Sequence, residues 1–369
     1  MKNILISGAS FAGLCTAYWM NKLGYQVTIV EVASGLKKGG TPVNIMENTI
    51  DVVKRMGLFD QIVAKQLHME SMSFKNADDV TQLVDFRAKD ESLTDEVEYE
   101  VERDFLLNLL YEAVKDNTTF IFKERITSLK ETATQMHVSF KNKAPQSFDL
   151  VFGCDGIHSA VRKHWFGEEA LFSHFLKAYF SITIVHKLLI PENTTQMYSE
   201  PGKTVMLNAY NGKTDICLCF LSENEISYDY RNEQQMREIM LSQFKDTAWR
   251  TPEMLKEVQE TEGFYFDKLC QMKMPSWTKG RVALVGDAGY CASPAAGRGG
   301  SLAIDGAAAL AAAFEKDHLN HEEAFSAYNE SFRPFIDELQ AQVIDFGLDV
   351  LIPRTEEAIQ NRYQNGLGF

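Results

Sequence analysis

The N-terminus carries the pattern that most restricts how this chain can fold. An apolar, β-prone run from Asn3 to Ser7 leads directly into GASFAG (residues 8–13). Helical character follows from Leu14 to Leu23, and a second apolar strand, Gln26 to Val30, ends at Glu31. A strand, a glycine turn, a helix and a second strand within about 30 residues form a βαβ unit. The pattern therefore predicts a doubly wound α/β sheet.

The glycine turn and Glu31 also predict a dinucleotide site. Glycines let a pyrophosphate approach the backbone at a helix N-terminus, and a carboxylate after the second strand can accept hydrogen bonds from a ribose. Gly8 and Gly13 stand where a GxGxxG motif requires glycine. Ser10 replaces the middle glycine, and its hydroxyl can help to hold a phosphate. Because Glu31 would repel a 2′-phosphate, this pocket is expected to take FAD or NAD and not NADP.

A second strand–loop–helix unit spans Gly280 to Phe314. Residues Arg281 to Gly286 predict a buried strand, Asp287 follows where that strand ends, and an Ala-rich helix is predicted from Ser301 to Phe314. The loop between them holds Pro294, Gly297, Gly299 and Gly300. Ligands of α/β sheets bind at the carboxyl ends of strands and at helix N-termini, so this unit predicts a ligand site. A strand–loop–helix unit without a ligand is the alternative.

Two shorter patterns lie between these units. The apolar strand Phe148 to Gly153 runs into Asp155-Gly156, which predicts a tight turn, and Ser159 is expected to cap the short helix that follows. Arg103 begins a helix, where the helix dipole disfavours a cation. It is therefore either a contact to a phosphate or cofactor edge, or a surface arginine.

The residue pattern of the sequence changes between Lys177 and about Lys268. Alternating apolar and polar residues replace the glycine loops and predict an antiparallel sheet with flanking helices, one face of which is available to a ligand. Five side chains are either pocket or core residues of this sheet: Met197, Met206, Asn208, Phe220 and Phe264. Helices are then expected from His321 to Ser331 and from Pro334 to Leu351, the second bracing both domains.

Composition excludes several classes of function. The chain has 369 residues and a net charge of −14 without a basic block, which disfavours nucleic-acid binding. No apolar run reaches the roughly 18 residues of a membrane span, and the N-terminus enters a strand without signal-peptide anatomy. A cytoplasmic protein is expected. The six cysteines have no CxxC spacing, so they predict buried free thiols and neither a metal site nor a disulfide framework.

Three motifs now stand in order: GASFAG with Glu31, GCDGIHSAVR (residues 153–162) and GRVALVGDAGYCASPAAGRGG (residues 280–300). This trio resembles the single-component (class A) FAD-dependent monooxygenases related to p-hydroxybenzoate and salicylate hydroxylases. The RPF…PR ending resembles the tetracycline-inactivating members. The family also has an arginine at the position of Arg103. The resemblance implies these FAD-contacting residues: Gly8, Ser10, Phe11, Ala12, Gly13, Glu31, Asn44, Arg103, Asp155, Gly156, Asp287, Pro294, Gly297, Arg298, Gly299 and Gly300.

The chain departs from the family pattern near the expected flavin. Gly289-Tyr290 stands where many members have Ala-His, Arg298 where a small or amide residue is commoner, and Asn44 where an Asp is frequent. These departures bear on oxidation rate and substrate choice, not on the fold.

The resemblance implies an α/β fold with a Rossmann-like FAD-binding domain of the GR2 type, an inserted antiparallel-sheet substrate domain and a long C-terminal helix. The expected boundaries are 1–70, 98–175 and 269–330 for the FAD-binding domain, 71–97 and 176–268 for the substrate domain, and 331–369 for the bracing helix.

The implied reaction is carried by the cofactor. NAD(P)H, with NADPH favoured, reduces FAD, and O₂ adds at C4a. The hydroperoxide then hydroxylates a small aromatic, polyketide or tetracycline-like substrate. No catalytic side chain is expected, His158 is interpreted as structural, and the protein is expected to be a monomer. Two alternatives stay open: a reductase or oxidase of the same fold, and a flavin-binding sensor without turnover.

Overall fold

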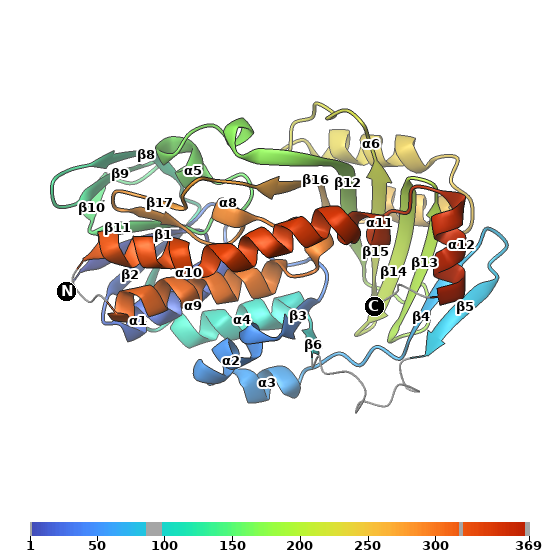
Figure 1. Cartoon of the computed structure of the whole chain (residues 1–369), viewed down its shortest axis with the longest axis horizontal. Coiled ribbons are helices and arrows are strands. Elements are labelled where there is room, and N and C mark those ends of the chain that lie inside the picture. The colour runs from blue at the N-terminus through green and yellow to red at the C-terminus, as the bar shows by residue number, and fades with distance from the viewer. Residues whose placement is uncertain (1, 86–97, 317–319, 366–369) are drawn as a thin grey trace.

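The computed structural model describes residues 2–85, 98–316 and 320–365. The chain forms two lobes around two β-sheets (Figure 1). The first lobe contains the N-terminus and a six-stranded sheet, and the second contains a seven-stranded sheet. The long helix α10 (His321–Gln342) runs along the first lobe toward the second (Figure 1).

The six-stranded sheet has the order β17-β18-β11-β1-β2-β7. Strands β1 (Asn3–Ser7), β2 (Gln26–Glu31), β7 (Thr118–Phe122), β11 (Leu150–Gly153) and β18 (Val282–Leu284) are parallel, and β17 (Thr278–Lys279) is an antiparallel edge strand. The near-continuous apolar residues of the inner strands are buried, as expected of a parallel sheet that is covered on both faces. The expected βαβ unit and the parallel α/β sheet are confirmed.

Helices and a small sheet cover the two faces of this sheet. Helices α1 (Phe11–Lys22), α4 (Arg103–Val114), α9 (Gly299–Lys316) and α10 pack together on one side (Figure 1). On the other side lie α5 (Ala160–Trp165) and the sheet of β8 (Ile126–Glu131), β9 (Met136–Phe140) and β10 (Gln146–Phe148). At the boundary with the second lobe, β3 (Val43–Met46) pairs with β6 (Glu98–Val101) beside α2 (Asn48–Arg55) and α3 (Phe59–Val63).

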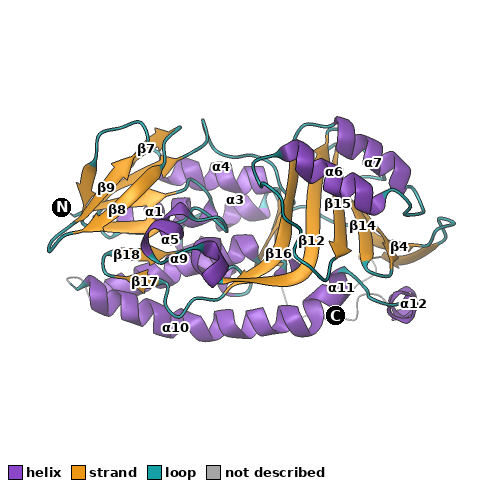
Figure 2. Cartoon of the chain, turned by 90° about the horizontal axis from the view of Figure 1, so that it is seen from above, coloured by secondary structure: helices purple, strands orange, loops and turns teal. Residues whose placement is uncertain are grey.

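The seven-stranded sheet has the order β16-β12-β15-β14-β13-β4-β5. Its strands are β4 (Ser71–Lys75), β5 (Thr81–Asp85), β12 (Ser173–Val185), β13 (Thr194–Glu200), β14 (Lys203–Tyr210), β15 (Lys213–Leu221) and β16 (Phe264–Met272). The sheet is antiparallel, as expected, except that β4 joins β13 in parallel. Helices α6 (Glu233–Phe244) and α7 (Thr251–Glu260) cover one face (Figure 2).

Three local expectations are corrected. Helix α1 begins at Phe11, not Leu14, and α9 begins at Gly299, so Gly299 and Gly300 are helical and not part of the preceding loop. Phe148 belongs to β10, because Asp149 separates it from β11 and its carboxylate accepts a hydrogen bond from the Asn3 N–H.

The C-terminal region also differs from the expectation. Pro334 lies inside α10, so the two expected helices are one. The chain continues through the π-helical segment Val343–Gly347 into α11 (Leu348–Leu351), and a separate helix, α12 (Glu356–Asn365), packs on β13. The segment beyond residue 331 is therefore not a single bracing helix. The domain boundaries stay a prediction, and residues 86–97 and 366–369 lie outside the described residues.

All six cysteines are free and buried, as predicted. Across residues 2–85, 98–316 and 320–365, no helix has the length and apolar character that a bilayer crossing requires. In the same part of the chain, no group of three or more His, Cys, Asp or Glu side chains could hold a metal ion.

Candidate flavin site

The motifs meet along one edge of the parallel sheet. Strands β2, β1, β11 and β18 are neighbours, and their carboxyl ends lead into Glu31, Gly8, Asp155 and Asp287 respectively. Three segments that are far apart in sequence thus present their glycines and acids at one place. This edge is where open α/β sheets bind ligands.

Gly8 and Gly13 form a tight turn that has no room for side chains. A Cβ on Gly8 would lie 2.4 Å from the Cys154 carbonyl oxygen, and a Cβ on Gly13 would lie 1.9 Å from the Gly8 carbonyl oxygen. Gly8 also has a φ of +104°, which disfavours any other residue. The turn leaves the N-terminus of α1 facing the sheet edge, where a phosphate would be stabilised. These residues fit the diphosphate of FAD.

Glu31 is positioned by the backbone on both sides of it. Its Oε2 accepts a hydrogen bond from the Ala9 N–H and its Oε1 accepts one from the Ala33 N–H, each 2.8 Å long. A carboxylate has about four lone-pair positions, so two remain for ribose hydroxyls. The carboxylate is therefore fixed at the end of β2 in the orientation that a ribose acceptor needs.

Arg103 lies against the first motif. Its guanidinium is 5.1 Å from the centre of the Phe11 ring, and Nη1 donates to the carbonyl oxygens of Lys37 and Gly39, at 3.1 and 2.8 Å. Burial lowers the pKa of Arg103. The side chain is therefore not the surface arginine of the alternative interpretation, because it connects the loop after β2 to the start of α1.

Asp287 is exposed, although residues 282–286 and 288–293 on both sides of it are buried. Gly286, with a φ of +70°, turns the chain at this point, and a Cβ there would lie 3.2 Å from the Ala12 Cβ. The first and third motifs are therefore packed together. Burial of the surroundings raises the pKa of the Asp287 carboxyl, and a hydrogen bond with Cys291 partly opposes this effect. A carboxylate in this position can accept hydrogen bonds from a polyhydroxyl chain.

The loop after Asp287 is attached to β3 and α2. Arg298 makes a bidentate ion pair with Glu47, with N–O distances of 2.6 and 2.7 Å. The Ser301 hydroxyl donates to the Asn44 carbonyl oxygen at 2.6 Å, while the Asn44 amide donates to Glu98 at 3.2 Å. Gly300 packs so closely on β3 that a Cβ would lie 2.3 Å from Val43.

Two non-glycine residues with unusual backbone angles flank this contact. Glu47 has a φ of 46° with a ψ of −124°, and Ser293 has a φ of 94° with a ψ of 145°. Such strain is concentrated at functional sites. Glu47 is a residue that the sequence analysis did not identify, because no local pattern marks the strain. Pro294 and Gly297 lie in the same loop and are exposed.

Asp155 has its carboxylate occupied by the protein. Oδ2 accepts hydrogen bonds from Ser7 Oγ at 3.2 Å and from the N–H groups of Ala160 and Val161 at 2.9 and 3.1 Å, and Oδ1 accepts one from Ser159 Oγ. Ser159 caps α5, as predicted, by accepting from the Arg162 N–H. Asp155 thus joins β1 to α5, while Gly156 makes the expected turn with a φ of +77°.

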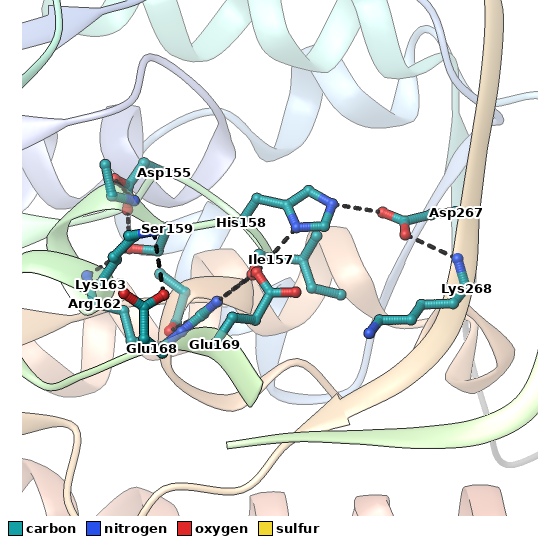
Figure 3. Close-up of polar contacts among 12 residues, drawn as sticks. Asp155, Ile157, His158, Ser159, Arg162, Lys163, Glu168, Glu169, Asp267 and Lys268 are labelled. Atoms are coloured by element: carbon teal, nitrogen blue, oxygen red, sulfur yellow. Dashed lines mark hydrogen bonds and ion pairs between the residues drawn. The ribbon is translucent and has the colours of Figure 1, made fainter. Parts of the chain in front are cut away.

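His158 links this loop to the second lobe (Figure 3). Its Nδ1 lies 3.0 Å from Glu169 Oε2, and its Nε2 lies 3.2 Å from Asp267 Oδ2 on β16. Burial disfavours the charged imidazole, but the contacts with Asp267 and Glu169 outweigh it and raise the pKa of His158 to about 9. The histidine therefore carries a positive charge at neutral pH.

The face of the second sheet opposite α6 and α7 carries both apolar and acidic groups. Phe220 and Phe264 belong to the core beneath the helices, whereas alternation places Met206 and Asn208 on the opposite face. Asp215, the cross-strand neighbour of Asn208, is fully buried, and its Oδ2 accepts from the Tyr210 hydroxyl at 2.9 Å. Burial raises the pKa of Asp215 to about 7.

Tyr265 is a second residue that the sequence analysis missed. Side chains alternate along β16, so Tyr265 lies on the face of the second sheet opposite α6 and α7. It is 39% exposed there, although Phe266 and Asp267 are almost fully buried. Its ring lies 5.4 Å from the Phe180 ring, and the Lys37 ammonium lies 5.8 Å from it. The buried surroundings of its hydroxyl, and then the charges of Asp267 and Asp287, raise the pKa of Tyr265 well above its ordinary value.

Comparison with known proteins agrees with this geometry. A family model described as an FAD binding domain matches residues 1–342. A flavin-dependent monooxygenase from an unknown prokaryotic organism is 32% identical over 347 residues, covering 92% of this chain and 88% of the relative.

Two solved structures resemble this chain over its whole length. The tetracycline destructase Tet(55) is 31% identical with a TM-score of 0.86, and the match covers all of this chain and 95% of that one. Tet(51), also a tetracycline destructase, is 30% identical with the same TM-score and 96% coverage of its chain.

Proposed function

The chain belongs to the FAD binding domain family, among the class A flavin-dependent monooxygenases, and we propose that it uses NAD(P)H and O₂ to hydroxylate an aromatic, polyketide or tetracycline-like small molecule. FAD, when bound, would accept a hydride from NAD(P)H, with NADPH favoured, and activate O₂ at its C4a atom. We also propose that the protein works as a monomer in the cytoplasm.

The observation that carries this proposal is the meeting of Gly8, Glu31 and Asp287 at the carboxyl ends of strands in one sheet, with Gly13 in the first turn of α1 beside them. In the proposed complex, the turn at Gly8, Ser10 and Gly13 holds the diphosphate and Glu31 holds the ribose of the adenosine. Phe11 and Ala12 shape the start of α1.

The other cofactor residues would act on the flavin half. Asp287 binds the ribityl chain, Arg103 orients the loop at Gly39, and Asp155 and Gly156 support the turn beside the diphosphate. Asn44, Pro294, Gly297, Arg298, Gly299 and Gly300 face the pyrimidine edge of the ring. Helix α9 begins at Gly299, and the partial positive charge of its N-terminus would favour negative charge on a flavin bound there.

The substrate is proposed to lie between this edge and the face of the second sheet that carries Met206, Asn208 and Tyr265. That face combines apolar surface with hydrogen-bonding groups, which suits a hydroxylated aromatic or polyketide ring. Tetracycline is a suitable first probe, because two similar structures are tetracycline destructases.

The test is anaerobic stopped-flow reduction of the FAD-loaded protein by NADPH, with and without tetracycline or simple phenols, followed by O₂ and mass spectrometry. Reduction that a ligand accelerates, together with a gain of one oxygen atom in that ligand, supports the monooxygenase. Reduction without oxygen transfer to any ligand favours the reductase or oxidase, and binding of FAD without reduction favours the sensor. Failure to bind FAD at all would refute the proposal.

A matched pair of variants assigns the result to the proposed site. Asp287→Ala should lower the rate of reduction at a fixed, subsaturating FAD concentration, because the loss of the ribityl contact weakens FAD binding. Asp60→Ala, on the exposed surface of α3, should leave it unchanged.

A further inference from the structure

The proposed substrate face of the second sheet is divided into two rows by the pairing of its strands. Residues that are direct partners in an antiparallel ladder have their side chains on one face. The apolar row crosses five strands and consists of Met197, Met206, Cys217, Ile182 and Tyr265. The polar row beside it consists of Thr195, Asn208 and Asp215, and ends at Ile184. This arrangement suits a ring that carries a polar substituent on one side.

The first lobe contacts the polar row at two places. A Cβ on Gly39 would lie 3.6 Å from Ile184 Cδ1, so the loop after β2 lies against one end of the row. At the start of β15, Lys213 Nζ donates to Glu102 Oε1 at 2.5 Å. Because Glu102 directly follows β6, this contact holds β6 against the strand that carries Asp215.

Glu100 projects from β6 on the side that carries Asn44. The two residues are direct partners in the ladder of β3 and β6, so their side chains share a face. The Asn44 carbonyl oxygen accepts a hydrogen bond from Ser301 of α9 at 2.6 Å, which places this pair of residues beside the candidate flavin site. Glu100 is half-buried, and burial, followed by the charges of Glu98 and Asp215, raises its pKa to about 7.

Asp215 brings a second carboxyl toward Glu100 from the other lobe. It is fully buried, and its Oδ2 accepts from the Tyr210 hydroxyl at 2.9 Å. Within residues 2–85, 98–316 and 320–365, its Oδ1 is buried and has no hydrogen-bond partner. Folded proteins rarely leave such an atom unsatisfied. Because no donor of these residues compensates Oδ1, the negative charge of Asp215 is available to a cationic ligand.

The charges around the two carboxyls are mainly negative. Among the described residues that act on them, Lys213 is a cation, but it is already paired with Glu102. Glu98 adds negative charge beside Glu100, and Glu102 does so beside Asp215. Burial is the main cause that raises the pKa of Asp215 to about 7. Two ionised carboxylates at this place repel each other, and a cation bound between them removes the repulsion.

We propose that Glu100 and Asp215 form a subsite for an ammonium group, so that the protein prefers aromatic or polyketide rings that carry a basic amine. This preference rests on the proposed function and adds a charge class to its substrate. The ammonium donates a hydrogen bond to the half-buried Glu100, and the charge of the buried Asp215 stabilises it from the second lobe. The ring lies over the apolar row.

The test measures binding of two ligand pairs to the FAD-loaded protein by isothermal titration calorimetry. Tetracycline is compared with 4-dedimethylaminotetracycline, and tyramine with 4-ethylphenol, because an aliphatic amine is protonated at neutral pH. At pH 8, the amine of each pair that binds should have a dissociation constant at least about tenfold lower than its neutral partner. This advantage should shrink at pH 6, because carboxyls with a pKa of about 7 become neutral over this range.

Three variants separate the subsite from a structural role. Glu100→Gln should bring the two dissociation constants of a pair close together, and Asp215→Asn should also reduce their ratio. Both variants should bind the neutral ligand as the wild type does, whereas a disturbed fold would weaken both ligands. Glu260→Gln removes an exposed acidic charge from α7, on the opposite face of the same sheet, and should keep the wild-type ratio.

The outcomes distinguish the subsite from the proposed function. Neutral ligands that bind as tightly as the amines, or that are hydroxylated equally well, overturn the subsite and leave the monooxygenase proposal standing. An amine preference that persists in both Glu100→Gln and Asp215→Asn also overturns it. A protein that binds none of the four ligands and transfers oxygen to none of them overturns the proposed substrate class and the subsite together.

Discussion

Replacing Gly13 by Ala tests whether the turn at the end of β1 is limited by space and not by backbone angle. Gly13 lies in α1 without a positive φ, so alanine is compatible with its backbone and adds up to about 1 kcal/mol of helix propensity. The new Cβ would lie 1.9 Å from the Gly8 carbonyl oxygen. That oxygen cannot move freely, because the Gly8 N–H donates to Val30 at 2.8 Å. Overpacking of this kind costs about 1–3 kcal/mol.

Gly299→Ala is the matched control for stability. Gly299 is also near a helix N-terminus, but nothing lies within 4 Å of its Cβ position. Both variants gain the helix propensity of alanine, so this gain cancels when their free energies of unfolding are compared. Gly13→Ala should therefore be less stable than Gly299→Ala by about 1–3 kcal/mol. Urea denaturation of the FAD-free proteins measures this difference.

The same substitution should weaken FAD binding, because the displaced Gly8 carbonyl changes the turn that holds the diphosphate. A loss of at least about tenfold, or about 1.4 kcal/mol, is expected in a titration of flavin fluorescence. Equal stability of the two variants, with wild-type FAD affinity in Gly13→Ala, would refute the steric argument.

Three further predictions concern charged groups. Asp287→Ala should weaken FAD binding at least about tenfold without destabilising the FAD-free protein, because an exposed carboxylate there makes few protein contacts; a wild-type dissociation constant by fluorescence titration would contradict its assignment. The pKa of Asp215 is raised from its ordinary value to about 7 by burial, so its contribution to stability is present at low pH and is lost as the pH rises from about 4 to 7. The Asp215→Asn side chain stays neutral, so its free energy of unfolding should rise relative to that of the wild type between pH 4 and pH 8. Urea denaturation measures this difference, and a difference that does not change with pH would exclude this explanation. A double-mutant cycle on Arg298 and Glu47 should give a coupling of about 0.2–1 kcal/mol that falls in 1 M salt, because the pair is partly exposed; coupling that salt does not change would indicate another interaction.

Several features were predictable because the information is local. The βαβ unit follows from apolar runs and from glycines whose spacing fits a turn, and β1, α1 and β2 lie where the pattern predicts them, apart from the first turn of α1. The Ser159 cap was predictable for the same reason. Pro334 was misleading, because a proline in a helix costs one hydrogen bond, which the packing of α10 on α9 offsets.

The site was only partly accessible from the sequence. Gly8, Glu31 and Asp287 lie at strand ends, and Gly13 is in the first turn of the helix that follows β1, so the rule for strand ends places them together. Tyr265 follows no motif, since its importance depends on its neighbours from other elements, Lys37 and Phe180.

The sequence by itself determined the parallel sheet and the dinucleotide turn, because strand period, glycine positions and an acidic strand end are properties of short segments. Only the tertiary structure decided which distant groups meet. It paired Arg298 with Glu47, and it placed His158 beside Asp267 of the other lobe. Side-chain contacts of this kind depend on how whole elements pack, and the free energy that fixes them is spread over two hydrophobic cores and not encoded in any one stretch of residues.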